Sequence, residues 1–302
     1  MTRRFIPYLG ILVIVAHSVG NGQAGATGLA FLKLGVGGRS LGMGEAYSAI
    51  ASDPSAMYYN PASLSINHAS QLLLMHKEWI QDTRTEYLAA KAVLNKLTLG
   101  VSINSTSINN IEIREVPGPP QGAFDSHNAA IGLSGAYQID TSLGIGATGK
   151  YLYEKILVNE ASGYGVDLGS WYQTPLNIRI ALAVNNLGSM NALDNQETKI
   201  PTTIRAGGAY VTRLEAIDGT FTAASDVVSI TGENSTHLHL GAELNYREAL
   251  SLRVGYQTGY DARSFSTGVG FRYGQFQLDY AFLPTKYDLG STHTFSLLIE
   301  FD

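Results

Sequence analysis

From about residue 70 to its end, the chain alternates apolar and polar residues with a period of two. The segment 97–104 is one example, with apolar residues at every second position: Leu97, Leu99, Val101 and Ile103. Successive side chains of a β-strand point to opposite faces, so this alternation predicts strands with one apolar and one mostly polar face. The segments 142–155, 235–247 and 292–301 repeat the pattern, which indicates an all-β fold.

The alternation predicts about fourteen strands. They are expected near residues 70–80, 83–94, 96–105, 125–139, 142–155, 162–173, 177–187, 202–213, 219–229, 235–247, 250–258, 263–273, 275–283 and 292–301. Most reach the length of about 9–11 residues that a tilted strand needs to cross a bilayer. Tight turns, such as Asn95-Lys96 and Asp140-Thr141, alternate with longer connections expected at 106–124, 155–161, 188–201 and 284–291. Short turns at one end and long loops at the other are typical of outer-membrane barrels.

Alternation alone also fits a soluble β-sandwich, but three further features favour a membrane barrel. The number of predicted strands is even, and the last strand ends on the aromatic Phe301. Aromatic residues also cluster near strand ends on the apolar face, where a membrane interface requires them: Tyr151, Tyr153, Tyr172, Tyr210, Tyr246, Tyr256, Phe271, Tyr273, Tyr280 and Phe282. We therefore predict a transmembrane antiparallel β-barrel over residues 70–302.

The composition agrees with a barrel and excludes several classes of function. Only 15% of the 302 residues are charged, and the chain has 33 Gly and 17 Tyr. A formal net charge of −5 gives no basic surface for nucleic acid. The absence of Cys excludes disulfides, thiol catalysis and zinc sites built on thiolates. We predict neither a cofactor nor a bound metal, and no enzymatic activity.

The first 69 residues differ from the rest of the chain. Arg3 and Arg4 precede an apolar run from Phe5 to Val19, and small residues follow at 24–26, so residues 1–26 resemble a secretory signal peptide. After residue 26 no apolar run is long enough to form a spanning helix. The segment 39–51 is expected to form a short amphipathic helix that ends before Asp53-Pro54-Ser55. A fourteen-stranded barrel needs water or a plug in its lumen, so residues 27–69 are predicted to be that plug.

The string GRSLGMGEAYSAIASDPSAMYYNPASLS at residues 38–65 resembles the N-terminal signature of FadL-like outer-membrane proteins, most closely their PorV/PorQ branch, which is associated with type IX secretion. The resemblance implies that these residues form a plug or hatch at the base of a fourteen-stranded barrel. Its motif positions in this chain are Arg39, Ser40, Gly42, Gly44, Asp53, Pro54, Asn60, Pro61 and Ala62.

The resemblance leaves two functions open. A PorV/PorQ-like protein would be a non-enzymatic component of protein secretion or surface attachment. A FadL-like protein would instead be a channel for hydrophobic small molecules such as long-chain fatty acids. The channel would need an apolar ligand lining near the plug, for which the candidates are Met43, Tyr47, Ile50, Met57 and Tyr58. A plug packed against the barrel would use the same residues.

Both functions imply the bacterial outer membrane and its lipid as surroundings. The strand that ends at Phe301 is expected to engage the barrel-assembly machinery. Secretion-system proteins or cargo are possible partners of the first function.

Other motifs have competing interpretations. Gly38 to Gly42 matches a nucleophile-elbow string, and Gly144 to Lys150 resembles a phosphate loop, but neither sits between a strand and a helix as its chemistry requires. His237, His239 and Glu243 share one strand face and are interpreted as polar lumen residues rather than as metal ligands. Lumen-facing charges could pair with one another, hold the plug through Arg39, Glu45 or Asp53, or simply be solvated: Arg205, Asp226, Glu243, Arg253, Arg272 and Asp279.

Overall fold

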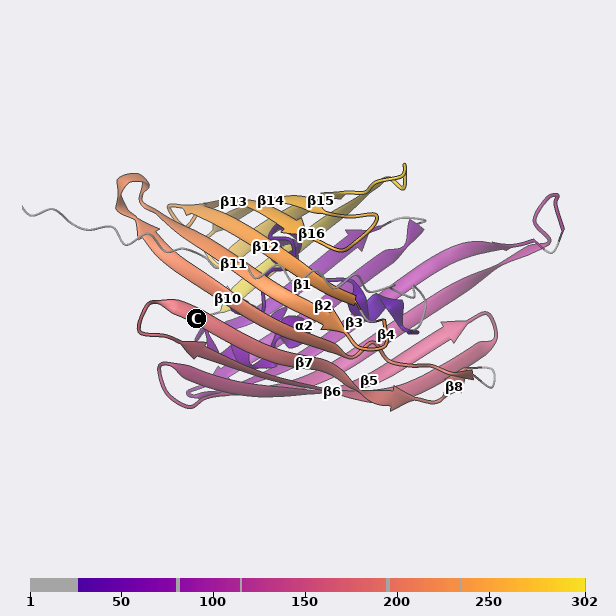
Figure 1. The fold of residues 1–302 in the computed structure, drawn as a ribbon, viewed down its shortest axis with the longest axis horizontal. Helices are drawn as coiled ribbons and strands as arrows, with labels where there is room; N and C mark the ends of the chain where they lie inside the picture. Colours follow the sequence, from indigo (N-terminus) through magenta and orange to yellow (C-terminus); the bar gives the residue numbers. More distant parts are fainter. Residues whose placement is uncertain (1–26, 80–81, 115, 194–195, 234, 302) are drawn as a thin grey trace, which may run out of the picture.

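A computed structural model describes residues 27–79, 82–114, 116–193, 196–233 and 235–301. Within them, fourteen antiparallel strands form a closed barrel in which β1 pairs with β16 (Figure 1). The strands are β1 (Ser70–Glu78), β2 (Arg84–Leu94), β3 (Leu97–Ile113), β4 (Gly122–Gln138), β5 (Leu143–Ile156), β6 (Asn159–Gln173), β7 (Ile178–Met190), β10 (Thr203–Leu214), β11 (Gly219–Ile230), β12 (Ser235–Tyr246), β13 (Leu250–Gln257), β14 (Phe265–Tyr273), β15 (Phe276–Pro284) and β16 (Ser291–Phe301). The predicted fold class is confirmed.

Most large apolar residues of the strands face outward and most polar residues face the lumen, although apolar side chains such as Leu73, Met75 and Trp171 pack in the cluster with the plug. On β3, Leu99, Val101 and Ile103 are exposed, whereas Ser102 and Asn104 between them are buried. A soluble protein would bury the apolar set, so the outward belt is a surface for lipid. Aromatic side chains are exposed on the same outer face, among them Tyr151, Tyr172, Tyr210, Tyr246, Tyr256, Phe271 and Tyr273.

Two features of the connections differ from the expectation. β3 and β4 continue through most of the predicted loop 106–124, so that the connection begins only after Ile113. The expected long connection at 155–161 is instead a tight turn between β5 and β6. A small hairpin, formed by β8 (Ala192–Leu193) and β9 (Gln196–Glu197), occupies the connection between β7 and β10. This connection and the one between β3 and β4 lie at the same end of the barrel, which we call the long-loop end. At the other end every turn is tight, and we call it the short-turn end.

The hairpin of β3 and β4 extends beyond its neighbours at the long-loop end (Figure 1, right). β3 pairs with β2 only as far as Ser107, and β4 pairs with β5 only as far as Ser126. Past these residues the two strands pair only with each other, with an irregularity between Ile108 and Ile111. We call residues 108–126 the arm.

Residues 27–69, the plug, precede β1 and lie inside the barrel. Their helical turns are η1 (Ala30–Lys33), α1 (Gly38–Gly42), α2 (Ala56–Tyr59) and η2 (Pro61–Ser65). The expectation of one helix over 39–51 is wrong. The helix ends at Gly42 because Gly44 and Glu45 adopt positive φ angles of 62° and 59°, which no α-helix allows. In the described part of the chain, no helix is long and apolar enough to cross a membrane.

The plug spans the lumen from wall to wall. α1 contacts β13 to β16, and η2 contacts β3 to β6. The first residues of the plug pack at the long-loop end, where Leu29, Phe31 and Leu32 join a buried cluster with residues of the wall. There Lys33 Nζ lies 2.5 Å from Glu233 Oε1. The predicted signal peptide, residues 1–26, lies outside the described residues.

Candidate functional site: the plug, its contacts with the wall and the cavity beside it

A ladder of charged side chains fixes α1 to the barrel wall. Arg39 on α1 donates two hydrogen bonds to Glu243 on β12, at 2.7 and 2.9 Å. Arg253 on β13 donates to Glu243 at 2.6 Å and to Asp279 on β15 at 2.7 Å. Burial lowers the pKa of Arg39 and the Glu243 carboxylate raises it, so that the pKa lies well above its ordinary value. Arg39 is therefore one end of a chain of ion pairs that joins the plug to the wall.

A second ionic contact holds the turn after α1. Arg263, in the connection between β13 and β14, donates to Glu45 Oε1 at 3.1 Å. Burial raises the pKa of Glu45, but Arg263 and neighbouring cations lower it more, and the pKa lies below its ordinary value. On β11, Asp226 accepts the backbone N–H groups of Tyr47 and Ser48 at 3.2 and 2.9 Å.

The motif Asn60-Pro61-Ala62 packs against the opposite wall. Asn60 Nδ2 donates to the carbonyls of Ser48 and Ser170, and Asn60 Oδ1 accepts from the N–H of Ala62 at 3.2 Å. The indole N–H of Trp171 on β6 donates to Ala62 O at 3.1 Å. Glycines on β5 and β6 leave the space for this packing. A Cβ on Gly146 would lie 2.5 Å from Ala62 N.

Asp53 and Pro54 organise the middle of the plug. Asp53 accepts the N–H of Ser55 at 2.8 Å, which starts α2, and it accepts the hydroxyl of Tyr47 at 2.5 Å. Burial raises the pKa of Tyr47 well above its ordinary value and keeps this hydroxyl a donor. Asp53 thus bonds within the plug, unlike Arg39 and Glu45, which bond to the wall. Lys91 on β2 donates to the carbonyls of Ser52, Leu64 and Asn67.

Four of the five candidate ligand-lining residues are packed inside the plug. Met43, Tyr47, Met57 and Tyr58 belong to one buried cluster and are at most 8% exposed. The Tyr58 hydroxyl donates to Leu32 O at 2.8 Å. Ile50 alone of the five also borders the cavity described next. As the structure stands, these side chains contact protein rather than open space.

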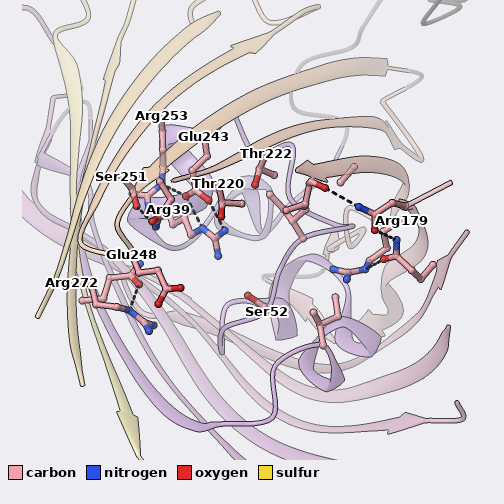
Figure 2. A pocket seen from close by; sticks show the side chains of 18 residues that line it. Arg39, Ser52, Arg179, Thr220, Thr222, Glu243, Glu248, Ser251, Arg253 and Arg272 are labelled. Atoms are coloured by element: carbon pink, nitrogen blue, oxygen red, sulfur yellow. Dashed lines mark hydrogen bonds and ion pairs between the residues drawn. The ribbon is translucent and has the colours of Figure 1, made fainter. Parts of the chain in front are cut away.

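A cavity of about 550 Å³, the vestibule, opens at the short-turn end beside the plug. Its lining includes polar side chains next to the tight turns, together with Ile50, Ile66, Ala209 and Val211. Figure 2 shows Arg39, Glu243, Arg253, Arg272 and Glu248 gathered on one side and Arg179 across from them. The site is therefore polar and charged, not the apolar pocket expected of a channel for hydrophobic molecules.

The lumen charges differ in role. Arg205 lies over the rings of Tyr58 and Tyr59, with 5.9 and 5.3 Å to the ring centroids. Arg272 lies 3.5 Å from Glu300 on β16, so its ion pair is within the wall rather than with the plug. Arg179, Arg263 and Lys91 contact the plug and were not among the residues singled out by sequence. Their inward position on predicted strands was the available signal for Arg179 and Lys91. The predicted strand 263–273 puts Arg263 on the outward face instead, and in the structure Arg263 lies in the connection before β14.

The remaining motifs have structural roles. The Ser40 hydroxyl donates to the carbonyls of Val36 and Gly37, so it is part of the plug's own packing. His237 stacks on Tyr260 with 3.8 Å between ring centroids, and His239 bonds the Tyr260 hydroxyl at 3.0 Å. Among the described residues, no group of three or more His, Cys, Asp or Glu side chains is arranged to hold a metal ion.

A closed barrel with an apolar outer belt, a polar lumen and an internal plug defines the class of this protein. It is a transmembrane β-barrel of the bacterial outer membrane. Residues 14–166, just over half of the chain, match the model of an uncharacterised protein family, UPF0164, and the chain belongs to that family. No curated protein matches the chain.

Solved structures share the fold at low sequence identity. The Ralstonia pickettii toluene transporter TbuX is 14% identical with a TM-score of 0.63, and the match covers 89% of this chain and 99% of that one. The Pseudomonas putida toluene transporter TodX is 14% identical with a TM-score of 0.61, over 88% of this chain and 97% of that one. A Pseudomonas aeruginosa FadL homologue is 12% identical with a TM-score of 0.54, over 88% and 98%. Such identities establish the shared fold alone.

Proposed function

We propose that this protein is a sealed outer-membrane barrel of the PorV/PorQ type, a non-enzymatic component of protein secretion or surface attachment. The observation that carries the proposal is the occupied lumen. The plug contacts both walls, and its apolar side chains are consumed in packing. A barrel sealed in this way acts through its surface more readily than through its interior.

The arm gives such a protein a surface for partners. Among the described residues of the arm, β3 past Ser107 and β4 before Ser126 pair with each other and have no second neighbour in the barrel sheet. The tip exposes Val116, 62% accessible, next to the turn at 117–120. Strand edges without a neighbour pair readily with an extended segment of another chain. Short turns are periplasmic in bacterial barrels, so the arm would face outward from the cell.

A native pull-down with and without the arm tests the proposal. The arm variant replaces residues 109–125 with an Asn-Gly turn, because Ile108 and Ser126 already form a register pair. We expect the intact protein, extracted in mild detergent, to recover specific secretion or cargo proteins that the arm variant does not. Equal recovery by both proteins, or recovery of no protein by either, would contradict the proposal.

The second candidate is a FadL-like channel for hydrophobic small molecules. It is favoured by the full-length fold similarity to barrels that are described as toluene transporters. In that function the plug would have to move, and the Arg39–Glu243 contact at the edge of the vestibule would break. Met43, Tyr47, Met57 and Tyr58 would then be free to line a path.

Uptake into vesicles separates the two candidates. Liposomes that contain the purified barrel would be mixed with radiolabelled toluene or oleate, with protein-free liposomes as the reference. The attachment function predicts equal accumulation in both. Faster, saturable accumulation with the protein present, together with lipid or hydrocarbon recovered from the purified material, would establish the channel instead.

A further inference from the structure

The vestibule has the features of a ligand site, whether the protein serves attachment or transport. We propose that it binds a water-soluble oxyanion of the phosphate class, with Arg179 as the principal contact. The cavity of about 550 Å³ lies between the plug and the wall at the short-turn end, and it is large enough for a small phosphorylated molecule. The arginines that line the cavity are unequally paired with carboxylates.

Three of the four arginines are already committed to carboxylates. Arg39 bonds Glu243, Arg253 bonds Glu243 and Asp279, and Arg272 pairs with Glu300. Across the cavity, Arg179 has no carboxylate within ion-pair distance in the described part of the chain. A half-buried guanidinium that lacks a counter-charge is attractive to an anion.

The guanidinium of Arg179 is nevertheless held in place. Its Nε donates to Gln173 Oε1 at 3.1 Å and its Nη1 to Ala49 O at 3.4 Å. The group also lies 5.5 Å from the ring centroid of Trp171. These contacts use only part of its five N–H donors and orient the remainder. A cation that is fixed before binding loses little side-chain entropy when it binds.

The neutral residues around the cavity favour a tetrahedral oxyanion. Ser52 on the plug and Thr220 and Thr222 on β11 line the same space and can donate from directions other than that of Arg179 (Figure 2). Phosphate presents acceptor oxygens in several directions, whereas a carboxylate presents two in one plane. Most of the residues that line the vestibule are polar or charged, which matches a water-soluble ligand better than a lipid.

Glu248 is the residue that opposes an anion. It is exposed, it lines the vestibule on the side of Arg272, and its side chain is a carboxylate. Its replacement by Gln leaves the plug contacts intact and makes the cavity more positive. Removing one negative charge from the lining of a largely aqueous cavity corresponds to roughly two- to threefold tighter anion binding.

Trp171 provides the readout, because it lies against Arg179 and is one of only two tryptophans. In a Trp79→Phe background, Trp171 fluorescence would be titrated with inorganic phosphate at constant ionic strength, with chloride as the reference anion. We expect a saturable change with phosphate. Arg179→Gln should weaken it about tenfold or more, and Glu248→Gln should strengthen it about two- to threefold. Arg213→Gln, an exposed arginine at the same end, should leave it unchanged.

Several outcomes would overturn the proposal. A response that does not saturate, or that is the same in chloride, would mean that Trp171 senses salt alone. An unchanged affinity in both Arg179→Gln and Glu248→Gln would place the anion elsewhere. Because Glu248 is exposed and outside the plug contacts, its variant keeps the test decisive even if Arg179→Gln loosens the plug. Binding of short-chain phosphatidic acid without binding of inorganic phosphate would exclude a water-soluble ligand.

Discussion

At the scale of single residues, the position of the plug depends on a few buried charges. Arg39 and Glu45 each meet an opposite charge on the wall or in a wall connection, and Asp226 accepts two plug N–H groups. Burying these groups would be costly without partners, so each pairing fixes the plug in one orientation. The contacts therefore specify where the plug sits as much as how stable it is.

Glu243 should matter more to the plug than any other ladder residue. Glu243→Gln leaves Arg39 and Arg253 without the carboxylate that they share, at a cost of about 3 kcal/mol. We expect faster protease cleavage within residues 39–66 and a lower urea midpoint. Arg272→Gln is the matched control, because its partly exposed pair with Glu300 involves no plug residue and contributes under about 1 kcal/mol. Equal cleavage in the two variants would refute the role of Glu243.

The stability of the folded protein should depend on pH through the ionisation of Glu45. Its pKa is lower in the folded protein than its ordinary value of 4.5, so the unfolded state binds more protons as the pH falls. The stabilisation of the folded protein by the Glu45 carboxylate is therefore complete above about pH 5, and it is lost as the pH falls through the pKa of Glu45 in the folded protein. Glu45→Gln should cost about 3 kcal/mol at pH 7 by leaving Arg263 unpaired, and the difference from the unchanged protein should shrink toward pH 3. Urea unfolding at several pH values measures it.

The sequence predicted which kinds of residue would face the lumen but not their partners. Period-two alternation placed Glu243, Arg253 and Asp279 on the inner face correctly, because a strand has only two faces. For Arg272, contact with the plug was one of three open possibilities, and in the structure it pairs with Glu300 on the wall. Arg263 was missed because it begins the predicted strand 263–273 on the same face as the outward residues Phe265 and Val269, whereas in the structure it precedes β14 and reaches Glu45. Partners depend on strand order and register, which a single strand's pattern does not contain.

At the scale of elements, strands were predicted well and helical turns poorly. Strand ends agree within a few residues where a turn signal such as Asn95-Lys96 stops the pattern. β3 and β4 were predicted too short, because the run Pro117-Gly118-Pro119-Pro120 suggested a loop around it. In the plug, backbone turns at Gly44 and Glu45 overrode the amphipathic spacing of 39–51. Short helices gain little from propensity and depend on the surrounding walls.

The η2 contact should be sensitive to one methyl group on β5. Gly146 faces the lumen, and a Cβ there would lie 2.5 Å from Ala62 N and 2.6 Å from Pro61 C, both backbone atoms. Gly146→Ala should therefore displace η2 and cost about 1–3 kcal/mol. Gly149 on the same strand has no atom within 4 Å of a Cβ, so Gly149→Ala should change stability by less than about 0.5 kcal/mol. Equal urea midpoints would mean that η2 does not require the glycine.

The arm should be dispensable for the barrel. Its strands pair only with each other beyond Ser107 and Ser126, so removing residues 109–125 leaves every other register of the barrel in place. We expect the arm variant to keep its heat-modifiable mobility on a gel and its melting temperature within about 2 °C, since surface changes are usually worth less than about 0.5 kcal/mol. A variant that fails to assemble would mean that the arm is part of the folding unit.

At the scale of the whole molecule, the barrel and the plug pack together as one body. The plug contacts both walls, its first residues pack at the long-loop end, and the vestibule is a cavity at the other end. Barrels of about 16–18 strands without a plug leave an aqueous channel. A fourteen-stranded barrel with a polar inner face would also conduct if it were empty, so the plug decides whether the protein is a pore.

Removal of the plug should convert the sealed barrel into a water-filled pore. In planar bilayers we expect no steady conductance from the intact protein, because buried plug residues such as Met43 and Leu64 fill the lumen. Deletion of residues 37–65 should give stable channels, because the lumen it leaves is lined by polar side chains that water solvates. Heat-modifiable mobility would confirm that the deleted barrel still closes. Steady conductance of the intact protein would show that the plug does not seal it, and would favour the channel over the attachment function.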